Sequence, residues 1–254
     1  MVDSAGSADG FRPSAIATLF AGNRLLATLS PADRAILEGS AEVVDLQRDT
    51  VLFDAGGDVG ASYFPAAGAM ISLVLFMRDG RSVEVATIGK EGAAGGIVSC
   101  GSTPAFARAV VQMPGPALRV PIAAIETTKS RSPQVRNLFC RYSDFLLAQI
   151  MQTVACNSFH PIEARAARWL LTAHDRGGNR LELTQESLAG LLGVQRTTVN
   201  AVARELQDEG LITTRRGIIE VHDRDGLERR SCECYNRVES FFEDIVGDKG
   251  IGRA

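Results

Sequence analysis

The pattern of apolar and polar positions is most regular between residues 183 and 221, where it predicts two short helices followed by two strands. Thr184 is a favourable N-cap residue, and Gly193 tolerates the backbone of a tight turn. The apolar positions of the first helix are Leu188, Leu191 and Leu192. Those of the second helix are Val199, Val202, Ala203 and Leu206. A capped helix, a glycine turn and a second helix in succession are typical of a helix-turn-helix.

The second helix carries polar side chains on the face opposite its apolar stripe. These are Arg196, Thr197, Asn200 and Arg204. After it, Leu211–Thr214 and Ile218–Val221 flank Arg215 and Arg216, which predicts a β-hairpin with cations at its tip. Helices and hairpin together predict a winged helix, whose second helix enters the major groove of DNA. The alternative is a helix pair that only packs against another protein.

Residues 183–221 resemble, without a gap, the DNA-binding domain of the Crp/Fnr superfamily of bacterial transcription regulators. The shared features are the Leu-Thr start, the Leu-Gly turn, the Arg-x-Thr-Val opening of the second helix and the Leu-x-x-x-Gly-Leu-Ile run into the wing. The resemblance implies that Arg196 contacts a guanine. The residues expected mostly to hold phosphates are Gln185, Gln195, Thr198, Arg215 and Arg216. It also implies a homodimer on a roughly palindromic double-stranded operator, with RNA polymerase as a further partner.

Composition limits the number of domains, the cellular location and the mode of DNA binding that the sequence allows. The 254 residues are enough for two domains, and 45% of them are apolar. No apolar run approaches the ~20 residues of a membrane span, and residues 1–13 lack a secretion signal pattern, so a cytoplasmic protein without a membrane partner is expected. A net charge of -3 excludes a protein that coats nucleic acid through global charge, so DNA binding would depend on local cations.

Between Glu42 and Ile125 the pattern changes to short strands broken by glycine-containing turns about every ten residues. The expected strands are 42–45, 50–53, 61–65, 69–76, 83–88, 108–112 and 117–121. This spacing predicts an antiparallel β-roll or jelly roll. The expected fold class is therefore α+β, with an N-terminal β-roll and flanking helices, a long central helix and a C-terminal winged helix-turn-helix.

Residues 89–92 and 108–110 resemble the cyclic-nucleotide-binding-like sensor of the same superfamily. The resemblance implies an effector site formed by Glu91, Gly92, Arg108 and Ala109, with the glutamate at a ribose and the arginine at a cyclic phosphate. However, Ala109 stands where the family has a hydroxyl side chain, and Ile150-Met151 stand where cyclic AMP binders have Thr-Ser. No cofactor is therefore assigned, and a cyclic nucleotide stays a candidate. The alternative is that Arg108 pairs with a carboxylate such as Glu84 or Glu91.

Residues 133–159 form a long predicted helix whose apolar positions recur every three and four residues. The stripe consists of Val135, Leu138, Phe139, Tyr142, Phe145, Leu146, Ile150 and Thr153. This spacing predicts a coiled-coil seam between two subunits. The expected interface residues are Leu138, Tyr142, Phe145 and Gln149. The alternative is that the stripe packs against the β-roll of its own subunit.

The predicted domain order follows from these segments. Residues 1–13 are expected to be a disordered tail, 14–132 the sensor β-roll, 133–160 the central helix and hinge, 161–246 the winged helix-turn-helix with a C-terminal helical extension, and 247–254 a tail.

Cysteine and histidine usage predicts no metal site. Five cysteines are an odd number at scattered positions, which argues against a disulfide framework. Cys232 and Cys234 lie two residues apart, which puts the thiols on different faces of a helix, and we interpret them as core or surface thiols. Metal binding or redox sensing is the alternative. His160, His174 and His222 are too dispersed to suggest a ligand set.

No grouping of nucleophile and base can be assembled from the three histidines, so an enzyme with catalytic residues is not expected. The predicted function is a homodimeric, sequence-specific DNA-binding transcription regulator. Its sensor domain would respond to a signal by repositioning the recognition helices. The alternative is an effector-binding signalling module that acts through protein partners without binding DNA.

Overall fold

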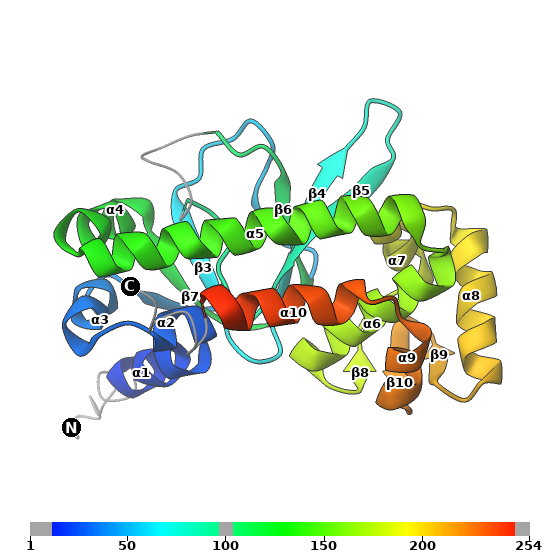
Figure 1. Cartoon of the computed structure of the whole chain (residues 1–254). Coiled ribbons are helices and arrows are strands. Elements are labelled where there is room, and N and C mark those ends of the chain that lie inside the picture. The colour runs from blue at the N-terminus through cyan, green and yellow to red at the C-terminus, as the bar shows by residue number, and fades with distance from the viewer. Residues whose placement is uncertain (1–11, 97–103, 247–254) are drawn as a thin grey trace, which may run out of the picture.

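Two antiparallel sheets form the N-terminal half of the computed structural model, which describes residues 12–96 and 104–246 (Figure 1). The first sheet has the order β1 (Glu42–Leu46), β7 (Gly115–Pro121) and β3 (Ala61–Pro65). The second has the order β2 (Val51–Phe53), β6 (Arg108–Met113), β4 (Met70–Phe76) and β5 (Ser82–Ile88). The expected β-roll is thus confirmed, and each strand end lies within two residues of its predicted position. The predicted tails lie outside the described residues, except for the last two residues of the first.

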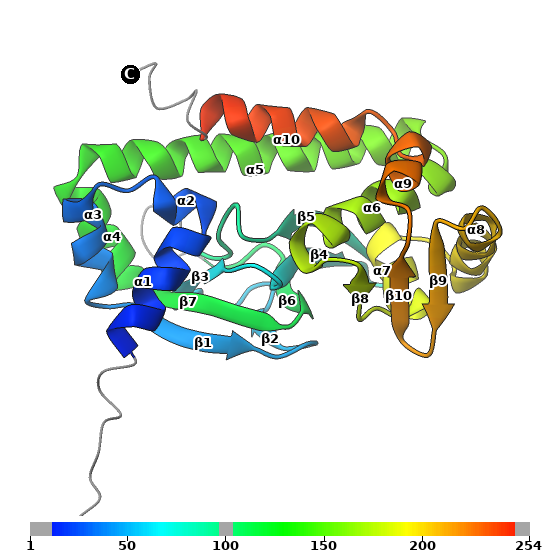
Figure 2. The same cartoon turned by 90° about the horizontal axis from the view of Figure 1, so that it is seen from below.

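Four helices cover one end of this β-roll (Figure 2). They are α1 (Arg12–Gly22), α2 (Arg24–Ala27), α3 (Pro31–Glu38) and α4 (Ile122–Arg131). Phe20, Leu26 and Leu37 from the first three helices share a core with Leu118 of β7 and Ile125 of α4. The sequence pattern did not predict α4, because its sequence, IAAIETTKSR, carries few apolar residues at helical spacing.

The long helix α5 (Pro133–Phe159) crosses the molecule, and α10 (Cys234–Ile245) lies along it in both views (Figures 1 and 2). The two helices are antiparallel, because Phe145 meets Phe242 edge to face at 5.0 Å while Gln152 contacts Cys234. The helical extension predicted for 223–246 is broken at residues 231–233, so that α9 (Arg224–Arg230) and α10 are separate helices.

The C-terminal half contains the expected winged helix-turn-helix, which completes the predicted fold class. Its elements are α6 (Ile162–Gly177), β8 (Arg180–Leu181), α7 (Gln185–Leu192), α8 (Arg196–Asp208), β9 (Ile212–Arg215) and β10 (Ile218–Val221). The three strands form an antiparallel sheet of order β8-β10-β9. Met70, Val74 and Met113 of the β-roll belong to the same buried core as Trp169 and Leu192. The winged helix is therefore docked on the second sheet of the roll.

The four residues predicted for the dimer interface lie inside the subunit, which corrects that prediction. Leu138, Tyr142, Phe145 and Gln149 are each at most 7% exposed. The Tyr142 hydroxyl bonds both backbone groups of Ala93, and the Gln149 amide bonds both backbone groups of Thr87. The β-roll and α10 of the same subunit pack against the apolar stripe of α5. The exposed large apolar residues of α5 are Leu147, Met151, Val154 and Phe159.

None of the helices within the described residues is long and apolar enough to cross a membrane.

Candidate nucleic-acid interface

The turn between α7 and α8 is built by local capping. The Thr184 hydroxyl accepts a hydrogen bond of 2.9 Å from the backbone of Ser187 and starts α7. Gly193 ends α7 with a left-handed φ of 67°, a conformation that costs glycine little. The Val194 amide then donates to the Ala189 carbonyl at 3.0 Å. This turn directs α8 away from α7, so that the two helices cross.

Helix α8 buries one face and exposes the other, as the sequence pattern predicted. Val199, Val202, Ala203 and Leu206 are at most 4% exposed and pack in the core of the winged helix. On the opposite face the solvent-exposed residues are Arg196, Thr197, Ala201, Arg204, Glu205 and Asp208, with Thr198 and Asn200 half-buried. The buried Oδ1 of Asn200 has no hydrogen-bond partner in the part of the chain that the structure describes. A row of side chains beginning at Arg196 is therefore presented to solvent.

The wing and the start of α7 lie beside this row. Gln185, Arg196, Arg215 and Arg216 line one open groove of about 540 Å³. The wing is held to α8 by Gln207, whose side-chain oxygen accepts bonds from the backbone and hydroxyl of Thr214 at 2.7 and 2.8 Å. Gln195 is exposed immediately before α8. Four of the side chains predicted to contact DNA, those of Gln185, Arg196, Arg215 and Arg216, thus lie on one surface.

Glu186 of α7 lies beside the start of this row. Glu186 Oε2 lies 3.7 Å from Arg196 Nε, and both side chains are more than 60% exposed. Ion pairs as exposed as this one contribute little to stability. Arg196 is therefore free to exchange this partner for another acceptor.

Residues 164–230 match the family model of the Crp-like helix-turn-helix domain. These residues form a Crp-like helix-turn-helix domain. The chain is also 37% identical over 71 residues to the HTH-type transcriptional regulator Cmr of Mycobacterium tuberculosis, a match that covers 28% of this chain and 28% of that protein.

The architecture around the Crp-like domain is shared with solved structures. A Crp/Fnr-family protein from Eubacterium rectale superposes with a TM-score of 0.64 at 17% identity, over 84% of this chain and 97% of that one. FixK2 from Bradyrhizobium japonicum gives a TM-score of 0.64 at 17% identity, over 76% of this chain and 98% of that one. At these identities the likeness shows the fold. The resemblance is confirmed for the Crp-like domain, and the whole described chain shares its fold with these structures.

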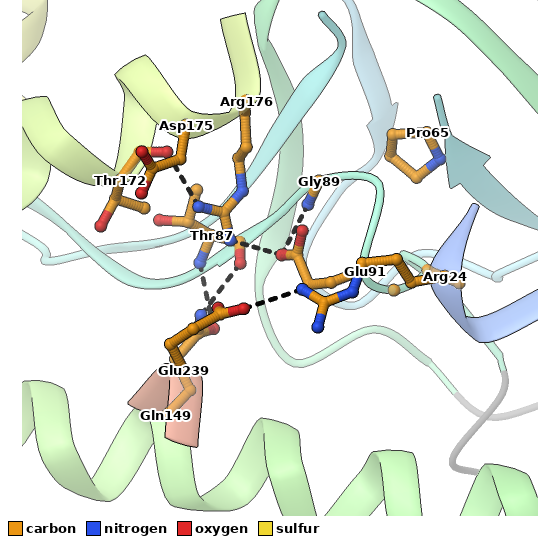
Figure 3. A network of polar contacts seen from close by, with 12 residues as sticks. Arg24, Pro65, Thr87, Gly89, Glu91, Gln149, Thr172, Asp175, Arg176 and Glu239 are labelled. Atoms are coloured by element: carbon orange, nitrogen blue, oxygen red, sulfur yellow. Dashed lines mark hydrogen bonds and ion pairs between the residues drawn. The ribbon is translucent and has the colours of Figure 1, made fainter. Parts of the chain in front are cut away.

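The predicted effector residues do not share a site. Glu91 is buried and pairs with Arg176 of α6, while its Oε1 also accepts a bond of 2.9 Å from the backbone of Gly89 (Figure 3). Arg108 instead forms a two-bond ion pair with Asp54 at 2.7 and 3.0 Å on the surface. The strand register explains the separation, because Arg108 aligns with Val74 of β4 whereas Glu91 lies beyond Ile88, which aligns with Ile71. Those two positions on β4 are about 10 Å apart.

The two other predicted effector residues are packing positions. A Cβ at Gly92 would lie 2.1 Å from the Tyr142 hydroxyl, so Gly92 allows the close approach of that ring. Ala109 is fully buried in the core of the roll. The alternative reading of Arg108, a pair with a carboxylate, therefore holds, although the partner is Asp54 rather than Glu84 or Glu91.

Two cavities adjoin the roll. An open pocket of about 310 Å³ has a mostly apolar lining that includes Phe53, Leu73, Val85, Phe106 and Ile150. A second cavity, of about 250 Å³, lies where the roll meets the winged helix and α10, and is lined by Glu84, Glu91, Arg168, Trp169 and Arg176. Neither lining includes Arg108.

The end of α5 brings together a histidine and three cysteines that are dispersed in the sequence. Cys156, His160, Cys232 and Cys234 place one ligand atom each within 4.8 Å of one another. Burial raises the pKa of the Cys156 thiol to about 12. The sequence signal that could have indicated the cluster is the spacing of four between Cys156 and His160, which puts both side chains on one helical face. Of the remaining cysteines, Cys140 is exposed on α5 and Cys100 lies outside the described residues.

Proposed function

We propose that this protein is a sequence-specific, double-stranded DNA-binding transcription regulator. The single observation that carries the proposal is the exposed row on α8 that begins at Arg196, within a Crp-like helix-turn-helix domain. An α-helix fits the major groove of B-DNA, where a guanidinium can bond both acceptors on the edge of a guanine. Arg196 takes that role, and Thr197, Asn200 and Arg204 follow it along the same helix.

The remaining polar residues of the interface position the helix. Gln185, Gln195 and Thr198 lie around the start of α8, and Arg215 and Arg216 extend from the wing. Donors of this kind mostly contact phosphates, which set register but carry little sequence information. Because the chain is acidic overall, affinity would depend on these local cations and fall with salt in proportion to the few phosphates neutralised.

The protein acts as a homodimer in this proposal, through a different face of α5 from the one first expected. Leu147, Met151 and Val154 are 56–63% exposed and are spaced by four and three residues. That spacing is the seam of a coiled coil, and pairing two copies would cover these apolar side chains. Two recognition helices would then meet the two half-sites of a palindromic operator, about one helical turn apart.

The sensor influences the DNA-binding helices through direct contacts in this proposal. The roll touches α6 at two buried polar positions, Glu84 with Trp169 and Glu91 with Arg176. A signal that altered either contact would shift the orientation of α8 relative to α5. The separation of Glu91 from Arg108 argues against a cyclic nucleotide held by that pair, so no cofactor is proposed. RNA polymerase is the partner expected of a bound regulator.

Selection from random duplex DNA tests this function. The full-length protein is incubated with a library of random duplexes, and the bound sequences are recovered over several rounds and compared. The proposal expects an enriched motif with two related half-sites and an affinity that decreases as salt is raised. Failure to enrich any motif, together with binding that does not respond to salt, would instead support a module that acts through protein partners.

A further inference from the structure

Three thiols and an imidazole form a compact cluster that the DNA-binding role does not use. Cys156 lies near the end of α5 and His160 directly follows that helix, whereas Cys232 lies between α9 and α10 and Cys234 begins α10. Cys156 and Cys234 are fully buried and Cys232 is 7% exposed. The three cysteines form a cluster of their own, and Ala164 is the one partly buried hydrophobic residue of the described segments that packs against it. Such a grouping contributes little as a hydrophobic core, which suggests a chemical role.

The spacing of the donor atoms suits a single tetrahedral ion. Cys156 Sγ lies 3.5 Å from Cys232 Sγ, and Cys234 Sγ lies 3.5 Å from His160 Nδ1. Zn²⁺ with Zn–S bonds of about 2.3 Å holds its ligand atoms roughly 3.5 to 3.8 Å apart. All the remaining pairs are within 4.8 Å, so small side-chain rotations would complete the tetrahedron. The set of three cysteines and one histidine is a common composition of structural zinc sites.

The neighbours of the cluster orient its ligands. His160 Nε2 lies 3.2 Å from Glu233 Oε2, which leaves Nδ1 facing the thiols. A carboxylate behind a ligating histidine fixes the ring and raises the basicity of its free nitrogen. The Gln152 amide donates to Cys234 Sγ at 3.0 Å, a bond that stabilises a thiolate. These contacts are the supporting interactions that metal ligands require.

Two half-buried arginines lie close enough to balance the charge of the occupied site. Zn²⁺ replaces the protons of three thiols, which leaves one net negative charge on the ion and its ligands. Arg168 and Arg165 of α6 both interact electrostatically with Cys156. The Nε atoms of both arginines are buried without a hydrogen-bond partner among the described residues. Paired buried charge is tolerated where isolated buried charge is not.

We propose that Cys156, His160, Cys232 and Cys234 bind one Zn²⁺ ion per subunit. The ion connects the end of α5 to the segment between α9 and α10, on either side of the Crp-like domain in the sequence. It therefore fixes the hinge at residues 157–161 and holds α10 against α5. The site is structural, because four protein ligands leave no open position for a substrate. It lies outside the row on α8, so its occupancy is testable whether or not the chain binds DNA.

Metal analysis of the full-length protein tests this proposal. Protein produced in zinc-supplemented medium and purified with a reducing agent, without chelator, is expected to contain about one zinc per subunit. Cys156→Ser and Cys232→Ser should each reduce the zinc content at least fivefold. Cys140→Ser is the matched control, since that thiol lies on the same helix but outside the cluster, and it should retain the ion. Cobalt added to the zinc-free protein should give the visible absorption of a tetrahedral thiolate site.

A milder variant distinguishes a direct loss of zinc binding from a loss caused by misfolding of the serine variants. Glu233→Gln leaves all four ligands in place and removes the carboxylate behind His160, and it should weaken zinc binding about 10- to 100-fold in competition with a chelating dye. Three results would overturn the proposal: wild-type protein that neither contains zinc nor binds added zinc, zinc retained by both cysteine variants, or iron in place of zinc. A disulfide between Cys156 and Cys232 in protein purified with a reducing agent would also overturn the proposal.

Discussion

The indole Nε1 of Trp169 donates a hydrogen bond of 2.9 Å to the buried Oε1 of Glu84, which joins α6 of the Crp-like domain to β5 of the roll. Trp169→Phe keeps the ring in the core but removes this donor. We expect a loss of about 1 kcal/mol in the free energy of unfolding, the usual net contribution of one hydrogen bond, because Thr87 still donates to the same oxygen. Urea unfolding measures the loss, and a double-mutant cycle with Glu84→Met, which removes the acceptor, isolates the pair. A coupling energy of zero would contradict the contact.

The buried carboxyl of Glu84 should also make the free energy of unfolding depend on pH. Burial raises the pKa of its carboxyl above the usual 4.5, although bonds from Ser72, Thr87 and Trp169 oppose the shift. The folded protein then holds the proton more tightly than the unfolded chain does. The stability from this group is fully present below pH 4.5 and is lost as the pH rises through the raised pKa.

The Glu84→Gln variant tests that sign, because glutamine stays neutral at every pH. The free energy of unfolding of the variant minus that of the wild type should become more positive as the pH rises from 4.5. Denaturant titrations of both proteins at a series of pH values give this difference directly. A difference that stays constant across the range would show that Glu84 keeps its ordinary pKa.

Replacing only one member of the buried pair of Glu91 and Arg176 should greatly lower the free energy of unfolding. Both side chains are at most 12% exposed, and Arg176 is the buried partner of the carboxylate (Figure 3). Arg176→Met leaves Glu91 charged and unpaired, so we expect a loss of about 3–5 kcal/mol. Adding Glu91→Gln removes the charge and should restore most of that loss. If the double variant were as unstable as the single one, lost packing rather than lost charge would be the cause.

The exposed apolar residues on α5, Leu147, Met151 and Val154, predict that the protein is a dimer. Met151→Glu places a charge among Leu147 and Val154, where two copies would meet, and should convert the dimer into a monomer at micromolar concentration. Light scattering after size-exclusion chromatography measures the mass. Gln134→Glu is the control, because it adds the same charge at an exposed position near the start of the helix. A dimer that survived Met151→Glu would place the interface elsewhere.

Local sequence signals predicted the elements well. The α5 helix has the bounds expected for it, because Ser132 caps it, Pro133 fits its first turn and Pro161 cannot continue it. The strands of the roll follow from alternating apolar residues between glycine turns. The Crp-like domain combines both kinds of signal over about forty residues, and its exposed row is where the pattern placed it.

Contacts between distant segments could not be predicted in the same way. The apolar stripe of α5 specified that the helix is buried on one side, but not that the roll and α10 would be the neighbours rather than a second subunit. Glu91 and Arg108 were paired by a family resemblance, whereas the strand register separates them. Cys156 lies 76 residues from Cys232, and only the docking of α10 on α5 brings their thiols together.

Comparing the motifs selected by the wild type and by Arg196→Ala shows whether the row beginning at Arg196 contacts the edges of bases. We expect the variant to enrich the same motif with the preference relaxed at one base pair in each half-site, a loss of about 1–3 kcal/mol of discrimination there. Arg131→Ala, an exposed arginine on α4, should leave the motif unchanged. An unaltered motif with Arg196→Ala would contradict the account.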